Sequence, residues 1–239
     1  MSRENPEKFN GNPANGQRTS VSRAEIPASG PPPGSPGSQR TALILALCAL
    51  AGLLGWIGWQ FWNRGATVTP LTWEELAPPP EAVLRPWTHL VIHHSDSRKD
   101  SVASIDRWHH LKGWDGIGYH LVIGNGMNMD LGAVEPTFRW RNQREGAHAG
   151  GGEQGRPYNQ LGIGICLIGK FNEDAPDPIQ EARLAELCAL LIRHIPTLSA
   201  ARIIGHRDVP GKSTDCPGQH LDVERIRYLV RQRLAGTGD

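Results

Sequence analysis

The first strong feature of the hydrophobic pattern is an uncharged apolar run from Thr41 to Trp62. About twenty apolar residues in a helix span the hydrocarbon core of a bilayer. Arg40 and Arg64 bracket the run, and three tryptophans gather at its end, as in the aromatic belt of a membrane interface. The run is too long for a signal peptide, and no small-residue cleavage site follows it. The pattern predicts a transmembrane signal-anchor helix at residues 41–63; a buried core helix is the less favoured alternative.

The segments that flank this run differ from it in composition. Residues 1–40 are rich in Pro, Gly, Ser and Asn and nearly lack large apolar side chains, so we expect them to be disordered. They carry more basic residues than the stretch that follows the run, and the positive-inside rule then puts the N-terminus in the cytoplasm. Residues 64–86, which include three consecutive prolines, predict a stiff tether. The rest of the chain is therefore expected outside the cytoplasm.

From residue 87 onward the pattern becomes that of a folded domain. Short apolar runs predict strands at residues 89–94, 119–123, 127–131, 161–168 and 202–204. Apolar residues at helical spacing predict helices at 104–111, with Ser104 as the N-cap, and at 179–195 and 221–234. Residues 132–160 are expected to be loop. Strands that alternate with helices predict an α/β or α+β domain over residues 87–236, with one sheet and helices packed on it.

Composition argues against several binding classes. The formal net charge is +1, so no electrostatic case exists for nucleic acid. The segment Gly205–Ser213 resembles a phosphate-binding loop, but five residues separate its glycines where the motif needs four, and we expect no nucleotide. The four cysteines show no dense pattern. For Cys166 and Cys188, two small buried side chains are favoured over a disulfide, which stays an alternative.

The chemistry is concentrated in the loop from Gly205 to Gly218, which is rich in Pro, Gly and Asp and contains His206 and Cys216. Imidazole and thiolate are common zinc ligands. The strand at 89–94 ends in two adjacent histidines, His93 and His94, whose side chains point to opposite faces, so only one can face a given metal. Periodicity alone does not choose between them. Three such ligands with one open position form the catalytic type of zinc site. A metal-free hydrolase with a cysteine nucleophile is a weaker alternative.

Several motifs in order resemble one family. They are Val91–Ser95, Ile105–His109 with Gly113–His120, Gly146–Ala149 with Gly162–Gly169, and Gly205–Val209 with Thr214–Gly218. In this combination the chain, over roughly residues 87–235, is similar to the zinc-dependent type 2 N-acetylmuramoyl-L-alanine amidases. That family includes the phage amidase lysozymes and the peptidoglycan recognition proteins. The resemblance implies a mixed central sheet flanked by helices and a groove that binds the peptidoglycan stem peptide.

The resemblance also implies roles for single residues. Zn²⁺ would be held by three ligands: His94, His206 and Cys216. Tyr119 would be the catalytic tyrosine, and Thr214 would lie beside the reacting carbonyl. His148 could line the groove as a substrate contact or satisfy a hydrogen bond within its loop.

Together these features predict a membrane-anchored peptidoglycan hydrolase. It would cleave the amide bond between N-acetylmuramic acid and L-alanine by zinc-activated water, in polymeric peptidoglycan or muropeptides. The predicted helix at 41–63 would place its domain in the periplasm, on a bacterial inner membrane that the chain crosses once. The alternative is a non-hydrolytic peptidoglycan-binding module of the same fold. Cys216 argues against that alternative, because recognition proteins that have lost activity tend to lack this cysteine.

Overall fold

The computed structural model describes residues 43–55 and 69–236. The chain divides into two units, Met1–Gly65 and Ala66–Asp239. In the first unit, residues 43–55 form a helix whose leucines are exposed. Within the described ranges, no helix combines the length and apolar character needed to cross a membrane. The predicted segment 1–40 lies outside the described residues, as do parts of the predicted helix at 41–63 and of the tether at 64–86.

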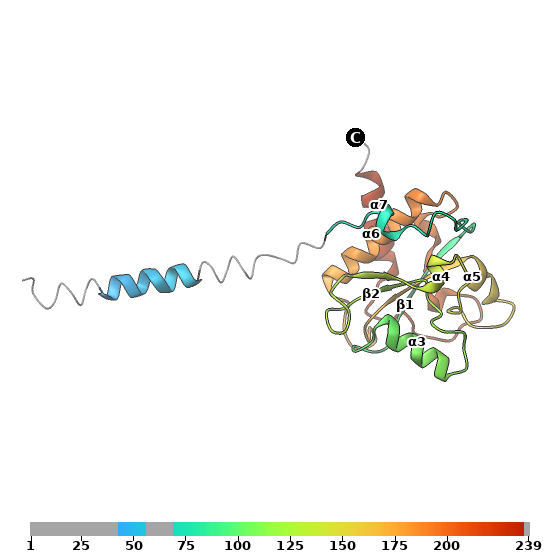
Figure 1. The fold of residues 1–239 in the computed structure, drawn as a ribbon, viewed down its shortest axis with the longest axis horizontal. Helices are drawn as coiled ribbons and strands as arrows, with labels where there is room; N and C mark the ends of the chain where they lie inside the picture. Colours follow the sequence, from blue (N-terminus) through green and yellow to red (C-terminus); the bar gives the residue numbers. More distant parts are fainter. Residues whose placement is uncertain (1–42, 56–68, 237–239) are drawn as a thin grey trace, which may run out of the picture. The chain divides into compact units, whose positions relative to one another are not determined.

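The second unit is built on a five-stranded mixed sheet with the strand order β3-β2-β4-β1-β5 (Figure 1). Four strands run parallel to one another: β1 (His89–His94), β2 (Leu121–Ile123), β4 (Gly162–Leu167) and β5 (Ile203–Gly205). The edge strand β3 (Val134–Pro136) pairs antiparallel with β2. The expectation of a mixed sheet is confirmed. The prediction of a strand at 127–131 is wrong. That stretch forms bends and turns, and β3, the antiparallel partner of β2, begins at Val134.

Helices cover both faces of the sheet (Figure 1). The long helices α6 (Pro178–His194) and α7 (Val223–Ala235) pack on one face, and α3 (Val102–Leu111) lies on the other. The N-cap of α3 is Ser101, not Ser104, because the Ser101 side chain accepts from the Ser104 N–H in a capping box. The expected helices at the C-terminal side are confirmed to within a few residues.

The segment 132–160, which we expected to be loop, contains β3 and two short helices, α4 (Phe138–Arg141) and α5 (Arg156–Leu161). Elements of three to six residues are too short to show a period, so the pattern misses them. The remaining short elements are α2 (Trp73–Leu76), η1 (Ala200–Arg202) and η2 (His206–Asp208). The side chain of Arg139 ties this segment to the loop before β2, donating to the carbonyls of Ile117, Glu145 and Asp115.

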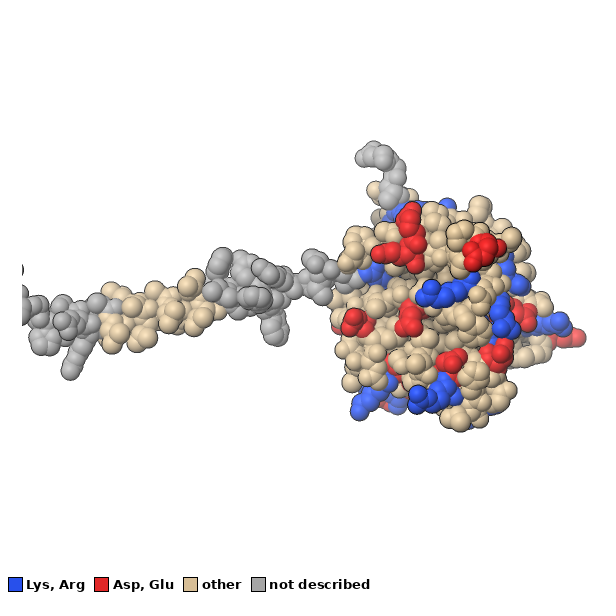
Figure 2. Space-filling model, viewed as in Figure 1, with Lys and Arg blue, Asp and Glu red and all other residues tan. Residues whose placement is uncertain are grey.

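The two faces of the sheet differ in character. The face toward α6 and α7 forms the main apolar core, which includes Leu90 and Ile92 of β1. The face toward α3 has two smaller apolar clusters, one around Val122 and one around Val91, with polar side chains between them. Cys166 and Cys188 are buried and free, so the interpretation as two small buried side chains is confirmed. On the surface that Figure 2 shows, acidic and basic side chains are interspersed.

Candidate metal centre

Three side chains of types that can bind a metal ion meet at the carboxyl end of the sheet. One ligand atom from each of His93, His206 and Cys216 lies within 4.8 Å of the other two. The Cys216 Sγ is 3.6 Å from His93 Nδ1, and the His93 and His206 ring centroids are 4.6 Å apart. His206 begins η2 directly after β5, and β5 pairs with β1, which brings the two histidines together. The expected partnership of His206 with Cys216 is therefore present in the geometry.

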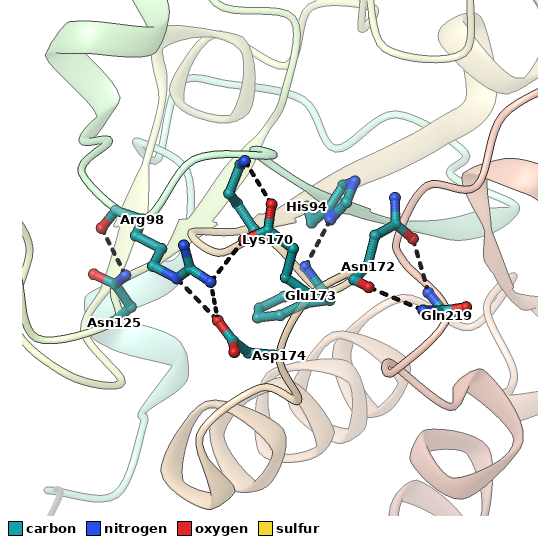
Figure 3. Close-up of polar contacts among 9 residues, drawn as sticks. His94, Arg98, Asn125, Lys170, Asn172, Glu173, Asp174 and Gln219 are labelled. Carbon is teal, nitrogen blue, oxygen red and sulfur yellow. Dashed lines mark hydrogen bonds and ion pairs between the residues drawn. The ribbon is translucent and has the colours of Figure 1, made fainter.

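The first member of the cluster is His93, which corrects our assignment of His94 to that position. In a strand, successive side chains point to opposite faces, so only one of two neighbours can reach the cluster. The His94 ring packs on the other face, where its Nδ1 accepts from the Phe171 N–H at 3.2 Å. Figure 3 draws this ring near Lys170 and Asn172, with its hydrogen bond to the Phe171 N–H as a dashed line.

The ring nitrogens of His206 and His93 differ in their hydrogen-bond partners. The His206 Nε2 is buried and has no hydrogen-bond partner among the described residues. A buried polar atom without a partner costs about 1–3 kcal/mol, so in native proteins it calls for an explanation such as a bound ion. The His93 Nε2 lies 3.0 Å from His148 Nδ1, which leaves His93 Nδ1 to face the cluster.

The titration of the three groups follows from their burial. Burial lowers the pKa of His206 to about 4, assisted by the charge of Lys212, and lowers the pKa of His93 well below its usual range. Burial raises the pKa of the Cys216 thiol to about 12, opposed by a hydrogen bond from the His94 backbone and the charge of Arg207. A cysteine nucleophile needs a thiolate near neutral pH. The metal-free cluster offers a neutral thiol, which argues against a cysteine hydrolase.

The loop that contains Cys216 is fastened to the segment that contains His206. The Arg207 backbone N–H donates to the Cys216 carbonyl at 2.8 Å. The Arg207 guanidinium donates to three further carbonyls of this loop, those of Asp215, Gly218 and Leu221. Thr214 is half-buried, and its Oγ1 accepts from the Cys216 N–H at 3.2 Å. That bond shapes the loop; the predicted contact of Thr214 with a substrate carbonyl stays a prediction.

Beside the cluster lies a groove on the α3 side of the sheet, and His206 lines it. A cavity of about 580 Å³ is lined by Trp108, His109, Trp114, Tyr119, Ala147, His148, Gly150, Gly151, Asn159 and His206. A second cavity of about 490 Å³ shares Trp108, His109 and Tyr119 with it and extends toward Ser95–Ser97 and Asp100. Tyr119 is half-buried between the two, with its ring 5.0 Å from that of His93. Burial, with the Cys166 and Cys216 thiols nearby, raises the pKa of Tyr119 well above its usual value.

The sequence reasoning missed the aromatic wall of this groove. Trp108 and Trp114 are about half exposed, and their ring centroids lie 5.9 Å apart. His109 lines the groove and also accepts from the Gly118 N–H at 3.0 Å. Two tryptophans close together at a helix end were the available signal, since large exposed aromatic side chains mark binding surfaces.

His148 lines the groove but is almost fully buried. Only 6% of it is accessible, and both of its ring nitrogens have protein partners: Nδ1 lies 3.0 Å from His93 Nε2, and Nε2 lies 3.2 Å from the Gly162 carbonyl. Burial lowers the pKa of His148 to about 3, so the ring is neutral. Of the two interpretations from the sequence, the structure shows satisfied hydrogen bonds, and the role in substrate binding stays a prediction.

The sequence profile of the N-acetylmuramoyl-L-alanine amidase family matches residues 83–219. The chain belongs to this family. The matched range begins before β1 and ends after Cys216, so it contains all three members of the cluster.

Individual relatives agree with this assignment. The endolysin of Enterobacteria phage T3 is 27% identical over 143 residues, which cover 57% of this chain and 85% of the endolysin. The peptidoglycan-recognition protein SC1a of Drosophila melanogaster is 29% identical over 143 residues, 56% of this chain and 69% of its own length. Among solved structures, the N-acetylmuramoyl-L-alanine amidase LysC from Clostridium intestinale aligns with a TM-score of 0.51 and 27% identity, covering 61% of this chain and 87% of LysC.

Proposed function

We propose that the protein is a zinc-dependent N-acetylmuramoyl-L-alanine amidase that hydrolyses the bond between N-acetylmuramic acid and L-alanine in peptidoglycan or muropeptides. The observation that carries this proposal is the His93–His206–Cys216 cluster, whose His206 lines an open groove. Family membership supplies the reaction class, and the names of the relatives point to the same substrate.

The donor set fits zinc. Two imidazole nitrogens and one thiolate are the ligands that zinc prefers, and three protein ligands leave one position for water or substrate. The unpaired, buried Nε2 of His206 is the atom that such an ion would satisfy. When bound, zinc would supply a Lewis acid that lowers the pKa of water toward ~7 and polarises the amide carbonyl. Cys216 would bind as thiolate and release its proton to solvent.

Residues around the cluster would bind and orient the substrate. The Tyr119 hydroxyl, held protonated by the raised pKa of this group, would donate a hydrogen bond to charge that develops on the carbonyl oxygen. Trp108 and Trp114 would cover one side of the bound peptide or sugar and exclude water from it. We also propose Thr214 as a contact to the reacting carbonyl, as the family resemblance implies.

We further propose that the chain is anchored in a bacterial inner membrane through residues 41–63, with the enzyme domain in the periplasm. The uncharged run with arginines at both ends supports this proposal. The tether would be shorter than the expected 64–86, because Leu71, Trp73 and Leu76 pack on the core of the enzyme domain. Fractionation of cells that produce the full chain, with protease added from the periplasmic side, tests the anchor and its orientation.

The hydrolytic function is tested by measuring the release of stem peptide from purified peptidoglycan, together with the zinc content of the protein. We expect release that stops on treatment with a chelator and returns with Zn²⁺. Tyr119→Phe should keep the zinc and lose about 10²-fold or more in rate, the usual cost of one such donor. Hydrolysis that resists the chelator would contradict the zinc mechanism. Binding without any cleavage would favour the recognition module.

A further inference from the structure

His148 has a structural contact beside its predicted role in the groove: it lies against His93. We infer that His148 is a positioning residue that fixes the tautomer of His93, so that the His93 Nδ1 lone pair faces the cluster. This inference rests on the proposed function, since it concerns how the protein presents one of its metal ligands.

The Gly162 carbonyl determines which ring nitrogen of His148 carries the hydrogen. The His148 Nε2 lies 3.2 Å from the Gly162 oxygen, which can only accept, so this nitrogen carries the hydrogen. In a neutral imidazole the other nitrogen is then an acceptor, and that nitrogen, Nδ1, lies 3.0 Å from His93 Nε2. The hydrogen in this second bond must therefore come from His93 Nε2. A neutral His93 is then unprotonated at Nδ1, the atom that lies 3.6 Å from Cys216 Sγ.

The ring of His148 has little freedom to leave this position. A Cβ added to Gly164 of β4 would lie 2.5 Å from the His148 Cδ2 and 2.6 Å from its Cγ, so the ring occupies the space that this glycine leaves. Gly146 makes a second such close approach. The backbone is clamped as well, because Asn159 Oδ1 accepts from the N–H groups of His148 and Ala149 at 2.9 and 2.7 Å. The acceptor for His93 is thus built into the fold.

The chemical class of this partner is unusual. Metal-bound histidines most often donate their other N–H to a carboxylate, a backbone carbonyl or water. Here the acceptor is a neutral imidazole, which adds no negative charge near the cluster. The positive charge of a bound ion would then be offset by the Cys216 thiolate alone, which leaves more of it to act on the substrate carbonyl. A partner of this kind orients the ligand without weakening the Lewis acid.

The test uses two substitutions of similar shape. His148→Asn keeps an acceptor oxygen near the position of Nδ1, whereas His148→Leu has a similar size and no acceptor. In full-length protein we expect His148→Leu to weaken Zn²⁺ binding about 10–100-fold in a chelator competition, the range for lost outer partners, and His148→Asn to recover most of this loss. Equal weakening in both variants, or wild-type affinity in His148→Leu, would overturn the inference. Thermal unfolding of both metal-free variants shows whether each one folds.

A second measurement separates this inference from the proposed function. Imidazole nitrogen resonances of the metal-free protein, recorded by NMR, should show His93 protonated at Nε2 in the wild type and in His148→Asn. In His148→Leu the same ring should shift toward the other tautomer or a mixture of both. If the wild type binds no zinc but keeps the Nε2–H form, the zinc proposal fails and the positioning role stands. If His93 carries its hydrogen on Nδ1 in the wild type, the positioning role fails by itself.

Discussion

The two histidines at the end of β1 have opposite surroundings although they are neighbours in the chain. His93 faces a polar cluster with two further metal-binding side chains and a buried imidazole. His94 faces the apolar side, where its ring contacts Phe171 and its Nδ1 accepts from the Phe171 N–H. The residue type is the same, and the strand is buried on both sides. The neighbouring strand determines whether a histidine of β1 faces the polar cluster or the apolar core.

The neighbouring strand β4 shows how that decision is made. In a parallel sheet, residues in register present their side chains to the same face. Val91 pairs with Gly164 and His93 with Cys166, so small residues line the His93 face and leave space for His148. The alternate residues of β4, which fill the other face, are Ile163, Ile165 and Leu167. An alternation of small and large residues in one strand thus marks the functional face of the next.

The largest expected effect comes from exchanging the two histidines for alanine one at a time. His93→Ala should lose bound zinc and about 10³-fold or more of the hydrolysis rate, because a Lewis acid contributes several kcal/mol to transition-state stabilisation. His94→Ala should keep its zinc and most of its rate, and lose stability instead. Zinc analysis, peptide release and thermal unfolding of both variants decide the matter. Loss of zinc in His94→Ala alone would restore our first assignment.

A smaller effect is expected from filling the space that β4 leaves. Gly164→Ala places a methyl group against the His148 ring, which should cost about 1–3 kcal/mol of folding free energy and weaken zinc binding. The matched control is Ile165→Val, one residue away on the opposite face. It should cost about 0.5–1.5 kcal/mol and leave zinc binding unchanged. Denaturant unfolding and chelator competition measure the two effects, and equal zinc affinity in both variants would contradict the assignment of faces.

The mildest expected effect is acid sensitivity on the histidine-rich side. Burial holds the pKa of His120 well below 6.5, and its nitrogens bond to the Gly164 N–H and the Arg144 carbonyl. Below about pH 6.5 His120 is protonated in the unfolded chain but stays neutral in the folded chain. The contribution of this group to folding stability is therefore complete above that pH and falls as the pH drops. The slope is about 1.4 kcal/mol per pH unit for one such group.

This slope is measured by denaturant unfolding from about pH 7 to about pH 5, on either side of the ordinary histidine pKa. A chelator is present, so that metal binding does not contribute. His120→Gln should make the curve flatter than the wild type. His220→Asn, which replaces an exposed histidine, is the control and should leave the slope unchanged. A steeper curve in His120→Gln would show that the acid sensitivity comes from elsewhere.

Much of the fold follows from the pattern of the sequence. Long apolar runs such as 161–168 and the helical spacing at 179–195 predicted the central strand and α6, because burial on both faces or along one stripe leaves a clear period. The short elements between 132 and 160 were missed, since each is set by contacts such as those of Arg139 and not by its own period.

The site, like the fold, could be predicted from the sequence only in part. His206 and Cys216 could be predicted because a loop rich in Gly and Pro concentrates them in one short stretch. The choice of His93 over His94 depends on which face β4 presents, and alternation within β1 alone does not contain that information. The partners of His148 were equally hidden: they are set by a glycine in a strand that lies distant in sequence and adjacent in space.

Arg207 ties the chain around Cys216 to the chain around His206 through four carbonyls. His206 and Cys216 therefore belong to one hydrogen-bonded unit, whereas His93 belongs to the sheet. The cluster is thus formed where two parts of the domain meet, this unit and β1. If this unit separates from β1, His206 and Cys216 move away from His93 together. A bound ion would then lose its His93 ligand in one event, and its residence time should follow how often the unit separates from β1.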